Sequence, residues 1–128
     1  MAEVRVTAMC HPTEDRTKVV GAISSIFPGA DIRGEGAIEA SVPSLEHFGE
    51  LLVRQQIRDA ARAIMRRNVS GNSTSFTLNK QVATAGKVSF SEESHPLGDI
   101  TVTITADDID ALIDMVAPST RPPRRDGK

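Results

Sequence analysis

The most constraining feature of this chain is the strict alternation of residues 100–105, where Ile or Val at each even position is followed by Thr. A period of two is typical of a β-strand with one buried and one exposed face. Residues 3–9 repeat the pattern, with Val4, Val6 and Ala8 between polar neighbours. The fold must therefore contain a sheet that other elements cover on one face.

The remaining pattern alternates between helical and extended segments. A helix is predicted from a cap at Thr13 to Phe27, because apolar residues share one face and Pro28-Gly29 ends the run. Residues 30–42 predict a hairpin. Further strands are expected around residues 76–78 and 88–90, and a last helix between Asp107 and Pro118. The order is β-α-β-β-α-β-β-β-α, which predicts an α+β fold with a mainly antiparallel sheet and helices on one face.

The longest helical segment begins at Ser44 and extends to about Arg67. Its first apolar residues lie on one face, and those from Val53 onward lie on a second face well over 90° away. Gly49 sits where the apolar face changes, and glycine is the residue that most easily allows a break. Two helices could therefore meet there, but we favour one continuous or slightly bent helix.

Composition excludes several classes of protein. One Cys cannot form an internal disulfide, and no apolar run approaches the roughly 20 residues of a membrane span. The first residues have no secretory signal pattern, so we expect a cytoplasmic protein. The length of 128 residues fits one domain, predicted for residues 1–118, followed by a disordered basic tail at 119–128.

Charge is segregated along the chain although the formal net charge is only −2. Residues 54–87 contain 7 basic and 1 acidic side chains, whereas residues 88–118 contain 7 acidic side chains and no basic one. Either the two segments neutralise each other in the fold, or the basic one binds an anionic partner.

Four arginines form a ladder on the predicted long helix: Arg54, Arg58, Arg62 and Arg66. Spacing by four places them within roughly 120° of one helix face. Such a row repels itself mildly, and a phosphate backbone would relieve that repulsion. A solvated face that pairs with the following acidic segment explains the ladder equally well.

A second polar group occupies residues 78–87, where Asn79 is expected to cap a short helical turn that ends at Gly86. Lys80, Gln81 and Lys87 lie in or beside this turn, and such side chains can contact phosphates and bases. From the residues alone, a capped surface turn is the simpler interpretation.

Catalytic and metal-binding patterns are missing from the sequence. Cys10, His11, His47 and His95 lack the spacing of a metal site, and no nucleophile elbow or phosphate-binding loop occurs. All four Phe occupy apolar-periodic positions, so no aromatic residue is expected to stack on bases. We therefore expect no cofactor, no metal and no catalytic residues.

Several segments together resemble a small archaeal family of uncharacterised proteins that are labelled RNA-binding. The segments that carry the resemblance are 12–15, 27–28, 51–62, 76–81, 86–90, 96–100 and 117–120. The resemblance implies a fold like that of the ribosomal protein that binds five-S ribosomal RNA, and an archaeal cytoplasmic protein. Some family members are joined to a nucleotide-kinase-like domain, which implies such a protein as a partner.

These observations lead to a prediction of a non-catalytic RNA-binding or ribosome-associated module. The predicted contact residues are Arg54, Arg58, Arg62, Arg66, Arg67, Asn79, Lys80, Gln81 and Lys87. The alternative is a protein-interaction module, either a homodimer or a complex with another partner through the same Arg face. An enzyme acting on a nucleotide phosphate is a third alternative, without an activated nucleophile to support it.

Overall fold

The computed structural model describes residues 2–10, 15–34, 36–91 and 99–118. In chain order, the elements are β1 (Ala2–Met9), α1 (Arg16–Ile26), β2 (Asp31–Arg33), β3 (Ala37–Val42), α2 (Glu46–Arg54), α3 (Arg58–Arg67), β4 (Ser73–Asn79), α4 (Lys80–Thr84), β5 (Phe90–Ser91), β6 (Asp99–Ala106) and α5 (Ile109–Val116). The predicted α+β class is confirmed. The predicted tail at 119–128 lies outside the described residues.

The strands form one six-stranded sheet in the order β2-β3-β1-β6-β4-β5, and each neighbouring pair is antiparallel. The alternating strand β6 lies inside the sheet, between β1 and β4. Val6 of β1 lies opposite Ala40 on one side and Val102 on the other, so the apolar positions of three strands share one face. Ile100, Val102 and Ile104 are buried, as the alternation predicts.

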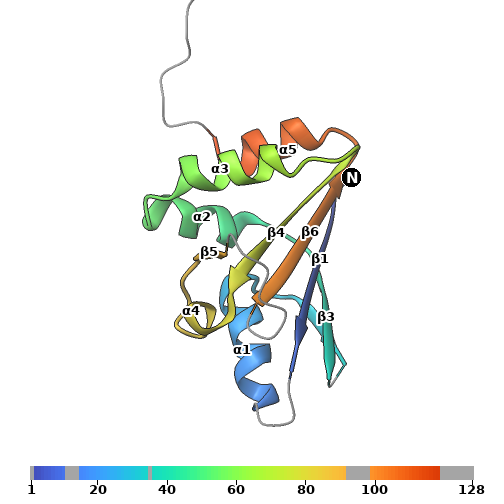
Figure 1. The fold of residues 1–128 in the computed structure, drawn as a ribbon, viewed down its shortest axis with the longest axis vertical. Coiled ribbons are helices and arrows are strands. Elements are labelled where there is room, and N and C mark those ends of the chain that lie inside the picture. The colour runs from blue at the N-terminus through green and yellow to red at the C-terminus, as the bar shows by residue number, and fades with distance from the viewer. Residues whose placement is uncertain (1, 11–14, 35, 92–98, 119–128) are drawn as a thin grey trace, which may run out of the picture.

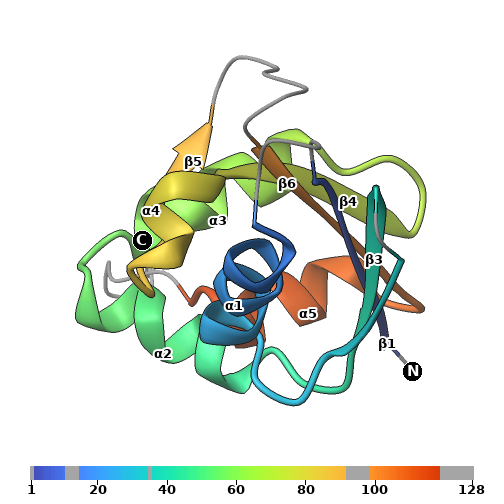
Figure 2. The same cartoon turned by 90° about the horizontal axis from the view of Figure 1, so that it is seen from below.

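All the described helices cover one face of this sheet, and none of them covers the opposite, open face (Figure 1). Turned by 90°, the helices still lie on one side of the strands (Figure 2). The four Phe side chains run through the core between the two layers, and successive ring centroids are 5.5, 5.6 and 5.5 Å apart. The prediction that every Phe belongs to the core is confirmed, which leaves no aromatic ring for base stacking on this open face.

Three helices begin after a residue whose short acidic or amide side chain caps the helix. The carboxylate of Asp108 accepts a hydrogen bond from the Ala111 N–H, and the Asn79 amide oxygen accepts one from Val82, both 3.0 Å long. The first helix is capped by Asp15, which accepts from Thr17 at 2.9 Å. The predicted cap, Thr13, lies outside the described residues. Caps of this kind satisfy backbone N–H groups that have no partner inside the helix.

The predicted continuous helix from Ser44 to about Arg67 is wrong. The chain forms α2 and α3, separated by a turn in which Gln56 adopts a left-handed φ of 60°. Two helices solve the problem of two apolar faces, because each one turns its own face to the core. Gly49 is not the break. It lies inside α2, where a Cβ would come 3.2 Å from the Val116 carbonyl oxygen, so its role is to let the end of α5 approach closely.

Candidate nucleic-acid interface

The turn between α2 and α3 divides the predicted arginine ladder. Arg54 lies in the last turn of α2, whereas Arg58, Arg62 and Arg66 lie on α3. The turn is held by backbone bonds from Gln56 to Val53 and from Ile57 to Leu52, at 3.1 and 3.0 Å. A single row of four arginines on one helix face therefore does not exist, because the left-handed residue redirects the chain.

Gln55 in this turn connects α2 to the segment that follows α4. Its amide nitrogen donates to the Val88 carbonyl oxygen at 2.8 Å, and its amide oxygen accepts from the Val88 N–H at 2.7 Å. Their chain neighbours Arg54 and Lys87 therefore lie at the same part of the surface, and both side chains are exposed. The sequence analysis missed this junction, because nothing in the residue pattern pairs position 55 with position 88.

Two further exposed cations, Arg66 and Arg67, lie in the last turn of α3. Cations there also interact favourably with the helix dipole. Among the residues that the structure describes, Arg54, Arg66, Arg67 and Lys87 take part in no ion pair. These four side chains are therefore the predicted contact cations that remain available to an outside anion.

Arg62 has a structural role instead. Its guanidinium forms an ion pair with the Asp114 carboxylate of α5 and also donates to the Ala117 carbonyl oxygen at 3.3 Å. Only 20% of its side chain is exposed. Arg62 therefore pairs with the acidic segment of the chain, which is one of the two interpretations of the ladder given above. The ion pair joins α3 to α5.

Arg58 lies at the start of α3 and is half-buried. Its Nε atom is buried and has no hydrogen-bond partner within the described part of the chain. An unsatisfied buried donor is costly, so this guanidinium is a point where a further partner would stabilise the fold.

The polar residues around α4 divide in the same way. Lys80 is only 5% exposed, and its ammonium donates to the Met9 carbonyl oxygen at 2.9 Å, so it secures the end of β1. Asn79 is half-buried and caps α4, as predicted. Gln81 alone of these three has an exposed side chain. We therefore leave Arg62, Asn79 and Lys80 out of the interface proposed below.

A metal or membrane role finds no support in the described ranges. These residues include no group of three His, Cys, Asp or Glu side chains that could hold a metal ion. His11 and His95 lie outside them. No described helix combines the length and the apolar character needed to cross a membrane.

Known proteins share both the sequence and the fold. A comparison with protein-family models finds no match. A UPF0201 protein of Sulfolobus acidocaldarius is 39% identical over 130 residues, which cover 94% of this chain and 90% of that protein. The chain belongs to the UPF0201 family. This is an archaeal family of uncharacterised function, which confirms the archaeal family predicted from the sequence segments.

The solved structures of the UPF0201 family agree with the fold described here. The crystal structure of the UPF0201 protein from Methanococcus jannaschii has a TM-score of 0.85 and 41% identity, and covers 93% of this chain and 95% of that one. A longer relative comes from Archaeoglobus fulgidus and is named "UPF0200/UPF0201 protein". It is 37% identical over 123 residues, and the match covers 93% of this chain but only 38% of that protein.

Proposed function

We propose that this UPF0201 chain is a non-catalytic, cytoplasmic module that binds structured RNA through its phosphates. The observation that carries the proposal is that four of the predicted contact cations are exposed and form no ion pair with any other residue that the structure describes: Arg54, Arg66, Arg67 and Lys87. Gln81 is exposed on the neighbouring α4 and adds a polar contact. A fold like that of the ribosomal protein that binds five-S ribosomal RNA is part of this proposal.

The placement of the four cations suits a duplex better than a single strand. Arg54 and Lys87 lie near the beginning of α3, and Arg66 and Arg67 lie at its end. Ten residues of helix span about 15 Å. The two pairs can therefore contact phosphates at separate places on an RNA duplex, which proteins recognise by its shape and by phosphate and 2′-hydroxyl contacts.

Recognition by base stacking is disfavoured by the composition and the core. The chain has no Trp or Tyr, and the four Phe rings pack against one another in the interior. Proteins that bind single strands rely on exposed aromatic side chains. Phosphate and shape contacts are what this surface can offer, and these are the contacts used on double-stranded RNA.

The test is a salt-titrated binding assay with archaeal ribosomal RNA and a matched pair of variants. One variant carries Arg54→Gln, Arg66→Gln, Arg67→Gln and Lys87→Gln. The control carries Arg5→Gln, Arg16→Gln, Lys18→Gln and Arg33→Gln, which are exposed cations on β1, α1 and β2. Each variant loses four positive charges, so a net charge of −2 becomes −6 in both.

Four phosphate contacts predict that the affinity of the wild type falls about 100-fold between 50 and 200 mM salt. The interface variant is expected to lose both the affinity and the salt dependence, while the control keeps them. Equal loss in the two variants would mean that only net charge matters and would contradict the proposed interface. No binding of the wild type at low salt would contradict RNA binding itself.

A protein partner is the second candidate function. In the Archaeoglobus fulgidus relative, the matched region is part of a chain whose name joins UPF0200 to UPF0201. Two regions in one chain meet at a high effective concentration, so a separate protein could occupy the same place beside this chain. The sequence resemblance predicts a nucleotide-kinase-like partner. A pull-down with such a protein as a separate chain would test this prediction. The interface variant is the control that shows whether the Arg surface is involved.

A further inference from the structure

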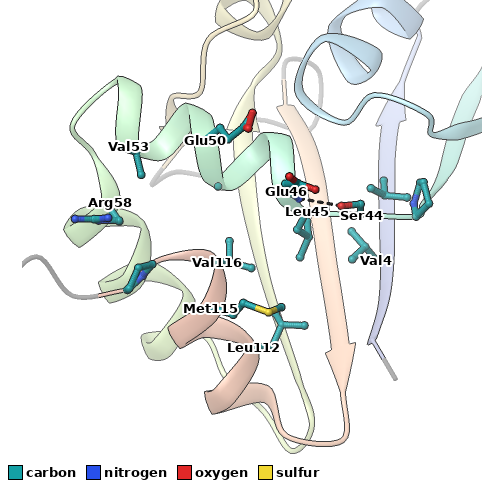
Figure 3. A pocket seen from close by; sticks show the side chains of 14 residues that line it. Val4, Ser44, Leu45, Glu46, Glu50, Val53, Arg58, Leu112, Met115 and Val116 are labelled. Atoms are coloured by element: carbon teal, nitrogen blue, oxygen red, sulfur yellow. Dashed lines mark hydrogen bonds between the residues drawn. The ribbon is translucent and has the colours of Figure 1, made fainter.

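An open groove of about 620 Å³ lies between α2 and α5 (Figure 3). Its walls are mainly apolar and come from both helices and from the nearby ends of β1 and β3. The apolar lining includes Val4, Val42, Leu45, Leu112 and Val116. A wet apolar groove of this size is unfavourable unless a partner covers it.

The exposed apolar side chains of the molecule concentrate at this groove. The described residues expose three large hydrophobic side chains, namely Met9 at 45%, Val53 at 52% and Met115 at 74%. Val53 and Met115 both line the groove, from α2 and α5, whereas Met9 is at the end of β1. Two exposed apolar side chains that line the same hollow indicate a contact surface rather than scattered surface residues.

The groove is lined by two carboxylates of α2, those of Glu46 and Glu50, and by one guanidinium, that of Arg58. Glu46 lies in the first turn of α2, and Arg58 lies just beyond the far end of that helix, at the start of α3. The nine residues of α2 span about 14 Å along the helix axis. Figure 3 shows Arg58 with Val53 at one end and Glu46 with Val4 at the other. Arg58 also brings its buried Nε, which has no partner in the described part of the chain.

We propose that a second copy of this chain covers the groove, in a twofold homodimer in which Arg58 of each copy faces Glu46 of the other. A twofold axis across the middle of the groove reverses its direction, so each cationic end meets a carboxylate end. Val53 and Met115 of both copies are then buried in the interface. This groove is a different surface from the cations proposed to bind RNA, and its proposed role does not depend on RNA.

The first test is sedimentation of the full chain without RNA, for the wild type and three variants. Met115→Glu and Val53→Glu place a charge within the proposed interface, at positions exposed enough for the monomer to fold. Met9→Glu is the matched control, because it makes the same change at an exposed methionine outside the groove. We expect the wild type and the control to dimerise at about 100 µM, and the two groove variants to dimerise at least about 30-fold more weakly.

The second test exchanges the charges. Arg58→Glu alone sets two carboxylates against each other at both ends of the dimer, and Glu46→Arg alone sets two guanidinium groups there. Each variant is therefore expected to be monomeric. An equimolar mixture restores opposite charges at both ends, and is expected to form a heterodimer with about the wild-type affinity. Circular dichroism of each variant shows that it is folded before mixing.

Each result either supports or overturns the proposal. A heterodimer from two monomeric variants is specific to the antiparallel pairing of residues 46 and 58. Dimers that persist in Met115→Glu, or that are lost equally in Met9→Glu, would overturn the proposed surface. A monomeric wild type at every concentration would overturn the homodimer, and would leave another protein or residues 119–128 of the chain itself as the occupant. None of these results depends on RNA binding.

Discussion

Gln55 and Val88 lie 33 positions apart and exchange two hydrogen bonds, one in which the side-chain amide donates and one in which it accepts. The side-chain amide has a donor and an acceptor on neighbouring atoms, as a peptide group does, so the pair acts as one more rung of backbone pairing between the α2–α3 turn and the segment before β5. It places Arg54 beside Lys87 and so creates one end of the proposed RNA surface.

Gln55→Ala is expected to destabilise the fold by about 1–3 kcal/mol, because the N–H and C=O groups of the buried Val88 lose their partners. Gln55→Glu keeps the acceptor but sets a carboxylate against the Val88 carbonyl oxygen, so we expect a loss of similar size. Urea unfolding measures both. Gln81→Ala, at an exposed amide, is the control and is expected to change stability by less than about 0.5 kcal/mol. A Gln55→Ala variant as stable as this control would show that the pair contributes nothing.

Among the residues that the structure describes, Gln56 is the non-glycine residue that has a positive φ, which is 60°. Its side chain is exposed. Gln56→Gly is expected to stabilise the protein by about 0.5–1 kcal/mol, because glycine adopts this conformation without strain. Gln56→Val is expected to cost at least about 1 kcal/mol, since a β-branched residue is a poor fit there. Thermal unfolding compares the two variants with the wild type. If the Gly and Val variants were equally stable, the turn would not be left-handed in solution.

The Arg62–Asp114 ion pair between α3 and α5 is partly exposed, with 20% and 61% of the two side chains accessible. A double-mutant cycle with Arg62→Gln and Asp114→Asn is expected to give a coupling of about 0.5–1 kcal/mol that decreases at high salt. Because Arg62 is engaged within the protein, Arg62→Gln is expected to leave RNA affinity unchanged within about twofold. An RNA defect as large as that of Arg66→Gln would return Arg62 to the interface.

A comparison of alanine substitutions at two helical glycines, Gly21 and Gly49, tests why Gly49 is needed. Gly21 on α1 is exposed, and a Cβ there would meet nothing within 4 Å, so Gly21→Ala is expected to stabilise the fold by about 0.5–1 kcal/mol through helix propensity. Gly49→Ala has the same propensity gain, but its Cβ would lie 3.2 Å from the Val116 carbonyl oxygen. We expect Gly49→Ala to be clearly less stable than Gly21→Ala in thermal unfolding. Equal stabilisation would show that α5 moves away at no cost.

The residue pattern was enough to predict most of the helices and strands that form the two layers of this fold. The period-two alternation in β6 and β1, the cap at Asn79, the start of the last helix after Asp107 and Asp108, and the apolar face of α1 are local signals, and each was found where it was predicted. They are predictable because the buried face of an element and its cap depend on residues a few positions apart. The same holds for the four Phe residues of the core, which occupy apolar-periodic positions.

What depends on residues far apart in the sequence was decided by the tertiary structure. Local spacing predicted a four-arginine face, but a left-handed Gln56 divides it, Asp114 engages Arg62, and Lys80 is buried against Met9. The sequence by itself therefore determined the class of fold and the stock of positive charge. Which charges remain free for a partner was decided only when helices and strands packed, because an ion pair or a buried hydrogen bond depends on distance in space and not on spacing along the chain.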